Sequence, residues 1–119
     1  MPFEITYRFE SDHVFAAIQG EPSLEEFLAA IRQIGAASVN WQQRCVIVDL
    51  TQVRREYSFT EQLVIGQTVA LNFKHLHRAA AVVQAERITR VGEKAARHSG
   101  APHVAVFASE SEAVDWIRS

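Results

Sequence analysis

One stretch near the middle of the chain, residues 44–50 (RCVIVDL), constrains the fold more than any other. Its consecutive apolar residues Val46, Ile47 and Val48 leave no polar face, which is typical of a strand covered by helices on both sides. Asp49 lies where this strand opens into a loop, at the edge where open α/β sheets place their sites. The stretch therefore predicts an α/β sheet and the location of a site, but not its chemistry.

The segment before this strand predicts a β-hairpin and a helix. Residues 3–9 alternate between apolar and polar side chains, and a second strand is expected at 13–19. Ser23 and Glu26 have the spacing of a capping box, in which each side chain satisfies a free backbone N–H at a helix start. We expect this first helix to end at Gly35.

The segment after the strand predicts a polar loop at 51–57 and a second helix from Ser58 to Phe73. Ser58 and Glu61 form another capping box. Apolar residues cover most of this helix, so it must be covered on more than one side. That cover is either the first helix or a second subunit, and we predict a homodimer.

The rest of the chain alternates strands and helices. We expect a strand at 78–85, a helix at 86–98, a strand at 103–108 and a helix after Ser109. The order ββαβαβαβα predicts a mixed sheet with right-handed parallel crossovers and helices packed on it. The strands at 45–50, 79–84 and 103–108 form its expected centre. With 119 residues, 48% of them hydrophobic, residues 1–119 are expected to form a single domain.

Three stretches carry a resemblance to a known family: VFAAIQGEPSLEEF at 14–27, RCVIVDLTQV at 44–53 and VAVFASESEAVDWI at 104–117. With this element order, the chain resembles the STAS/SpoIIAA-like domains of anti-sigma-factor antagonists and sulfate-transporter tails. The ending is also similar to that of small stand-alone STAS/SEC14-like bacterial proteins. The resemblance implies a non-enzymatic regulatory module that docks a protein partner near the start of the second helix. The alternative is a SEC14-like domain that binds a small or lipid-like molecule in an apolar pocket beside that helix.

Regulatory antagonists of this type carry a phosphorylatable Ser or Thr in an Asp-Ser-x-Gly turn at the start of the second helix. This chain has Tyr57, Ser58, Phe59 and Thr60 there, without the aspartate or the glycine. The resemblance makes Ser58 the candidate phosphorylation site and Thr60 the second candidate. As an ordinary helix cap, Ser58 also has a purely structural explanation.

The candidate binding site lies between the buried strand and the second helix. It comprises Asp49, Arg54, Arg55, Tyr57, Ser58 and Phe59. The helix start and the two arginines favour a small anionic ligand or an acidic partner segment. The alternatives are a solvated turn with an ordinary cap, and an Asp49 that accepts backbone hydrogen bonds from the next loop.

Several function classes are disfavoured by the sequence. The net charge of −2 argues against nucleic-acid binding. The five histidines and Cys45 show no metal-ligand spacing, and no nucleotide-binding or hydrolase motif occurs, so we expect no metal, no cofactor and no enzymatic activity. Cys45 is expected to be a buried, unreactive core residue. With no membrane-spanning run and no secretory signal pattern, we expect a cytoplasmic location.

Overall fold

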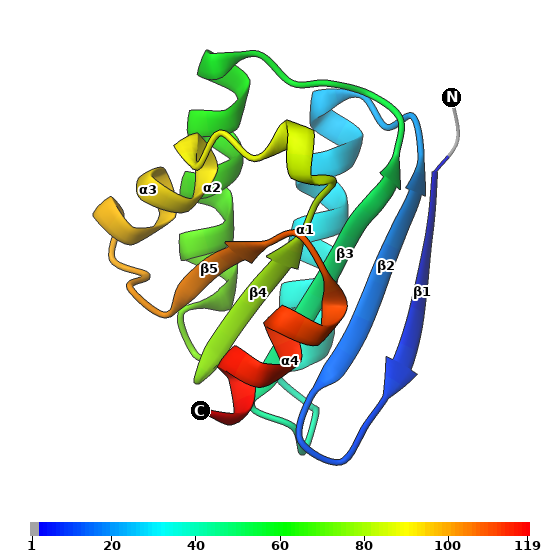
Figure 1. The fold of residues 1–119 in the computed structure, drawn as a ribbon, viewed down its shortest axis with the longest axis vertical. Helices are drawn as coiled ribbons and strands as arrows, with labels where there is room; N and C mark the ends of the chain where they lie inside the picture. Colours follow the sequence, from blue (N-terminus) through cyan, green and yellow to red (C-terminus); the bar gives the residue numbers. More distant parts are fainter. Residues whose placement is uncertain (1–2) are drawn as a thin grey trace.

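The computed structural model describes residues 3–119, which form five strands and four α-helices in three layers (Figure 1). The elements are β1 (Phe3–Phe9), β2 (Val14–Gly20), α1 (Leu24–Ser38), β3 (Cys45–Val53), α2 (Phe59–Phe73), β4 (Arg78–Val82), the 3₁₀ turn η1 (Ala85–Arg87), α3 (Val91–His98), β5 (Val104–Phe107) and α4 (Glu110–Arg118). The predicted order ββαβαβαβα is confirmed.

The sheet has the order β1-β2-β3-β4-β5, with β1 antiparallel to β2 and all other neighbours parallel. Each parallel strand is added on the same side of the previous one. Right-handed crossovers in one direction place their helices on one face of the sheet, so α1, α2 and α3 share a face. The short α4 lies on the opposite face, against β3, β4 and β5 (Figure 1). The mixed α/β architecture is therefore confirmed, with β3 at its centre.

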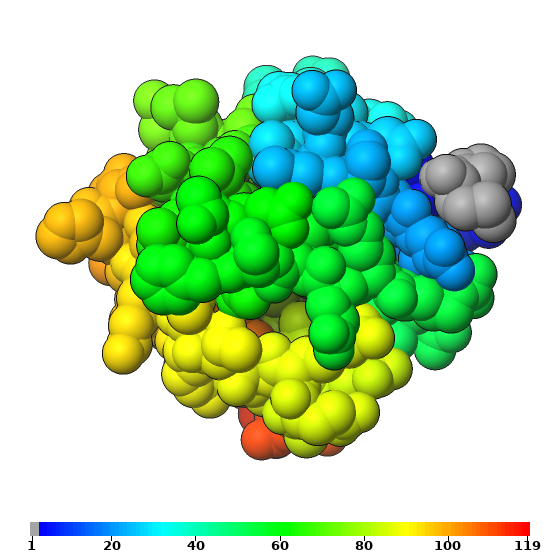
Figure 2. Space-filling view, turned by 90° about the horizontal axis from the view of Figure 1, so that it is seen from above, coloured from blue at the N-terminus to red at the C-terminus, as the bar shows by residue number. Residues whose placement is uncertain are grey.

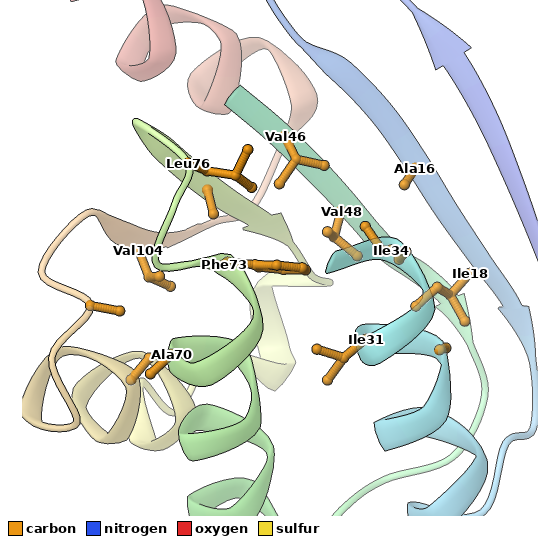
Figure 3. Packing of buried hydrophobic residues seen from close by; sticks show 14 of the residues in the cluster. Ala16, Ile18, Ile31, Ile34, Val46, Val48, Ala70, Phe73, Leu76 and Val104 are labelled. Atoms are coloured by element: carbon orange, nitrogen blue, oxygen red, sulfur yellow. The ribbon is translucent and has the colours of Figure 1, made fainter. Parts of the chain in front are cut away.

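The central strand β3 contributes to both sides of the core. Val48 lies in the larger apolar cluster under α1 and α2, which also contains Ile34 and Phe73 (Figure 3). Ile47, fully buried, lies in the smaller cluster under α4. Successive strand residues point to opposite faces, so a strand between two helix layers is apolar throughout.

Some predicted boundaries are wrong, and tertiary contacts explain why. Gly35 does not end α1, which continues to Ser38. A Cβ at Gly35 would lie 2.8 Å from the Cβ of Asn72, so the glycine permits close contact with α2. The predicted helix at 86–98 is divided into η1 and α3, since Arg90 adopts a left-handed conformation (φ 62°).

Other boundaries shift by a few residues. Strand β3 continues to Val53, into the expected loop, because β2 pairs with it up to that residue through a register shift. Strand β4 ends at Val82, earlier than expected. The first change lengthens the sheet at its carboxyl edge, and the second shortens it there. The connections to α2 and α3 begin at this edge.

Helix α2 is packed between α1 and α3. At Gly66 a Cβ would lie 2.4 Å from the backbone oxygen of Gly92, so the two backbones nearly touch. Within this chain, α2 is thus covered on two sides, and its apolar pattern needs no second subunit. Leu71 and Phe59 remain exposed on it. The homodimer stays a prediction.

Candidate functional site

A cleft of about 400 Å³ opens at the carboxyl edge of the sheet, beside α2. It lies between the β3–α2 connection and the segment that follows β4. Figure 2 views the molecule from this side and shows the hollow between the residues after β3 in green and those after β4 in yellow. The volume is in the range of small-molecule sites in proteins.

The cleft has an apolar interior and a polar rim. Apolar side chains and glycines come from α1, β3, α2, α3, β5 and the segment after β4: Phe27, Leu50, Val53, Ile65, Gly66, Val69, Val83, Ile88, Gly92, Ala96, Val104 and Val106. Polar side chains complete the lining: Arg55, Glu56, Tyr57, Gln62, Glu86, Arg87, Thr89, Arg90 and Glu93. The arrangement suits a mainly apolar molecule with one polar end.

One wall of the cleft is the segment 84–90, which we call the strap. Side-chain hydrogen bonds hold it to the rest of the edge, and three of them reach β3 and α2. Gln84 donates to the backbone oxygen of Thr51 (3.0 Å), Arg87 donates to that of Val53 (2.6 Å), and Thr89 donates to the Gln62 side chain (2.6 Å). The strap is therefore attached by side chains and not by a regular backbone ladder.

Tyr57 connects the cleft to α1. Its hydroxyl donates to the backbone oxygen of Pro22 at 2.8 Å, and its ring packs on Phe27 with 5.1 Å between centroids. The guanidinium of Arg55 lies 5.1 Å from the same ring. Burial raises the pKa of Tyr57 to about 12, so the phenol stays protonated at neutral pH.

The arginines of the predicted site are paired with acids. Arg55 lies 3.2 Å from Glu61, and Arg54 lies 3.5 Å from Glu21. On the strap side, Arg90 pairs with Glu93, whose carboxylate also accepts a hydrogen bond from the backbone N–H of Val106 (2.7 Å). These ion pairs neutralise much of the positive charge at the edge, which weakens its attraction for an anion. The anion-binding site stays a prediction.

The first residues of α2 do not line the cleft. The Ser58 hydroxyl accepts from the Glu61 backbone N–H (3.2 Å), while the Glu61 carboxylate accepts from the Ser58 N–H (2.9 Å). The predicted capping box is confirmed. Phe59 follows it with 64% of its surface exposed. Ser58, Phe59 and Thr60 therefore form an outer surface beside the cleft.

Asp49 does not join the other predicted residues. Its carboxylate accepts from the backbone N–H (3.0 Å) and the hydroxyl (2.8 Å) of Thr51. By the alternation of β3 it shares the face of Ile47, under α4. This geometry matches the structural explanation for an acid at a strand end.

Sequence reasoning omitted the strap and the residues of α3 and β5 that complete the cleft. The signal for them was present, because parallel neighbours end at one edge of a sheet. The residues after β4 must therefore lie beside those after β3. Of the predicted residues, the structure places Arg55 and Tyr57 in the cleft, and Arg54, Ser58 and Phe59 next to it.

The groups with potential reactivity lie apart from the cleft. Cys45 is buried under α4, and burial raises the pKa of its thiol. His13 is also buried, with its Nδ1 2.7 Å from Asp12. Within residues 3–119, no three metal-binding side chains are grouped to hold an ion, and none of the described helices is long and apolar enough to cross a membrane.

No family model matches the chain, and no curated protein matches it. Several solved structures are similar to it, including the following three. An anti-sigma factor antagonist from Mycobacterium paratuberculosis has a TM-score of 0.68 and 15% identity, over 99% of this chain and 96% of that chain. The protein TM1081, solved by NMR, has a TM-score of 0.58 and 18% identity, over 94% and 86%.

The third structure is an uncharacterized protein of the DUF3478 family with a SpoIIAA-like fold, from Shewanella loihica PV-4. It has a TM-score of 0.52 and 17% identity, over 97% of this chain and 93% of that chain. Together these structures establish the fold. The predicted STAS/SpoIIAA-like architecture is confirmed.

Proposed function

We propose that this chain is a cytoplasmic, non-enzymatic regulatory module that docks a protein partner on the surface around the start of α2. The observation that carries the proposal is Phe59, a large apolar side chain that is 64% exposed at a capped helix start. Arg54, with 66% of its side chain exposed, lies four residues before the cap. Exposed aromatic and arginine side chains are typical anchors of protein interfaces. The fold shared with an anti-sigma factor antagonist supports the same class of function.

Photo-crosslinking in the native cell tests this proposal. A photoreactive phenylalanine analogue in place of Phe59 is expected to form one prominent adduct with another protein. The matched control carries the analogue at Leu71, which is 71% exposed on the same helix but far from its start. The Arg54→Ala and Arg55→Ala double variant is expected to weaken the adduct. Equal adducts at both positions, or none at Phe59, contradict the docking surface.

Phosphorylation would act on this surface. Ser58 and Thr60 are both exposed, and a phosphate at a helix N-terminus meets free backbone N–H groups and the helix dipole. We propose Ser58 as the modified residue, with Thr60 as the alternative. A Ser58→Asp variant is expected to change the yield of the Phe59 adduct. If Ser58→Asp and Thr60→Asp both give the adduct yield of the original chain, control by phosphate at this surface is contradicted.

A second candidate function is supported by the cleft itself. Its volume of about 400 Å³ and its apolar interior beside α2 favour a small-molecule binding or sensing module. The near-neutral rim favours a ligand that is mainly apolar over a strongly charged one.

The fluorescent dye 8-anilinonaphthalene-1-sulfonate, which has apolar aromatic rings and one anionic sulfonate, tests the cleft. Val69 lines it from α2, so Val69→Phe is expected to fill the space and weaken dye binding by about tenfold. The matched control is Leu71→Phe, on the exposed side of the same helix. Unchanged dye binding in Val69→Phe, with an unchanged thermal midpoint, contradicts ligand binding in the cleft.

The non-enzymatic part of the proposal has its own test at Cys45. Because burial raises the pKa of this thiol and shields it, we expect slow labelling by a thiol reagent at neutral pH. The urea-unfolded protein, in which the thiol is accessible, is the control. Rapid labelling of the native protein would contradict this prediction and would make Cys45 a candidate nucleophile.

A further inference from the structure

Strand β1 forms one edge of the sheet, and no described segment pairs with its outer side (Figure 1). The backbone hydrogen bond from Glu10 N–H to His13 O (2.9 Å) closes the β1–β2 turn. In an antiparallel ladder, hydrogen-bonded pairs alternate with pairs that are not hydrogen-bonded. The even-numbered residues of β1 therefore bond to β2, and the N–H and C=O groups of Phe3, Ile5, Tyr7 and Phe9 point outward.

The side chains of β1 also alternate between the two faces of the sheet, odd-numbered residues on one face and even-numbered residues on the other. The odd positions face the α1 side, where Phe3, Ile5 and Tyr7 pack against the core. Phe9 continues this row but is 58% exposed, although its ring contacts Tyr7 and Trp41. Free strand edges normally carry features that prevent pairing. This edge carries charged side chains, but Glu4 and Arg8 have opposite signs, and the strand also presents outward backbone groups and an exposed phenylalanine.

The sequence of β1 is complementary to itself. In an antiparallel pair of two copies centred on Thr6, Glu4 of one copy lies opposite Arg8 of the other, and this contact occurs twice. On the other face, Ile5 lies opposite Tyr7, and Phe3 lies opposite Phe9. We propose that a second copy of this chain pairs with the edge of β1 in this register, so that the two sheets continue into each other.

Neighbouring registers are less favourable. Centring the pair on Tyr7 places Glu4 opposite Glu10, and like charges directly opposite each other destabilise a strand pair. Centring it on Ile5 places no residue of β1 opposite Phe9. In the Thr6 register Arg8 keeps its ion pairs with Glu10 and Glu110, and its Nη1 has no partner among the described residues. The Glu4 carboxylate of the second copy can therefore accept a hydrogen bond from this Nη1.

Amide hydrogen exchange followed by NMR tests the interface directly. In the monomer, the N–H groups of Ile5 and Tyr7 point to solvent and exchange fast, while those of Thr6 and Arg8 are protected by β2. At protein concentrations where sedimentation reports a dimer, the Ile5 and Tyr7 amides are expected to become protected by about tenfold or more. A monomer at millimolar concentration, or a dimer in which these two amides still exchange fast, overturns the proposal.

A charge exchange tests the register. Glu4→Arg places two arginines opposite each other and is expected to weaken the dimer by about tenfold, because the symmetric contact is lost twice. Arg8→Glu is expected to weaken it similarly. The double variant Glu4→Arg, Arg8→Glu restores opposite charges across the interface but still lacks the ion pairs of Arg8 with Glu10 and Glu110, so it is expected to dimerise about tenfold more tightly than Arg8→Glu alone. A double variant as weak as the singles overturns the Thr6 register. If the backbone amides of α2 become protected in the dimer and those of β1 do not, the interface is the surface of α2 and the proposal is wrong.

Discussion

At the scale of single residues, Ser58 has the clearest structural role in the candidate docking surface. Its hydroxyl satisfies a free N–H in the first turn of α2. Ser58→Ala is therefore expected to lower the free energy of unfolding by about 1 kcal/mol in urea denaturation. Ser58→Asp keeps an accepting oxygen and is expected to preserve most of that stability. Thr60→Ala, at an exposed neighbour, is the control, with an expected change within about 0.5 kcal/mol. Equal losses for Ser58 and Thr60 contradict the cap.

Asp12 gives the fold a dependence on pH. A hydrogen bond from Arg118, followed by one from His13, lowers the pKa of Asp12 from 3.8 to about 2. A carboxyl with a depressed folded-state pKa adds stability above its unfolded pKa and loses it as the pH falls through the folded value. Asp12→Asn is therefore expected to be less stable than the original chain at pH 7.

The stability difference between the Asp12→Asn variant and the original is expected to disappear between about pH 4 and pH 2. The Asp12 side chain is 38% exposed, so the difference is small and decreases in high salt. Chemical denaturation at a series of pH values measures it, with Asp115→Asn on the exposed side of α4 as the control. If the stability difference between Asp12→Asn and the original chain persists at pH 2, it arises from packing and not from the charge of Asp12.

At the scale of the elements, the contact between α2 and α3 depends on the absence of one side chain. A Cβ at Gly66 would meet the Gly92 oxygen at 2.4 Å and the Ala95 Cβ at 2.7 Å. Gly66→Ala must move α3, and we expect it to destabilise the fold by about 1–3 kcal/mol and to widen the cleft. Gly92→Ala is the matched control, because its Cβ would lie 3.6 Å from the Gln62 oxygen, an ordinary contact. Equal effects of the two substitutions in urea denaturation contradict the close approach.

The elements also show which boundaries sequence patterns can predict. The starts of α1 and α2 were predicted correctly, because a capping box is a local interaction between residues three positions apart. The end of α1 was not, because Gly35 contacts a helix more than thirty residues away. A glycine has the same appearance in the sequence whether it ends a helix or permits a helix contact.

At the scale of the whole molecule, β3 joins the two halves of the core. Ile47 is fully buried in the cluster under α4, and its neighbours in the strand face α1 and α2. Ile47→Ala is expected to lower the free energy of unfolding by about 2–5 kcal/mol in chemical denaturation. The exposed Leu71→Ala is the control, with an expected change within about 0.5 kcal/mol. A loss at Ile47 no larger than at Leu71 contradicts the central position of β3.

The sequence by itself determined the features that depend on neighbours along the chain. The period of two in β1, the apolar run of β3 and the capping boxes predicted the order of elements, and with it the sheet topology. It also placed the candidate site at the carboxyl edge of β3, since that edge follows from strand direction.

Only the tertiary structure decided which side chains meet at that edge. Asp49 is next to the predicted site in sequence but lies on the other face of the sheet, because one residue along a strand reverses the side-chain direction. The strap lies about thirty residues further along the chain, yet three hydrogen bonds attach it to β3 and α2. Separation in sequence carries no information on such contacts, because the pairing of β3 with β4 brings the two connections together.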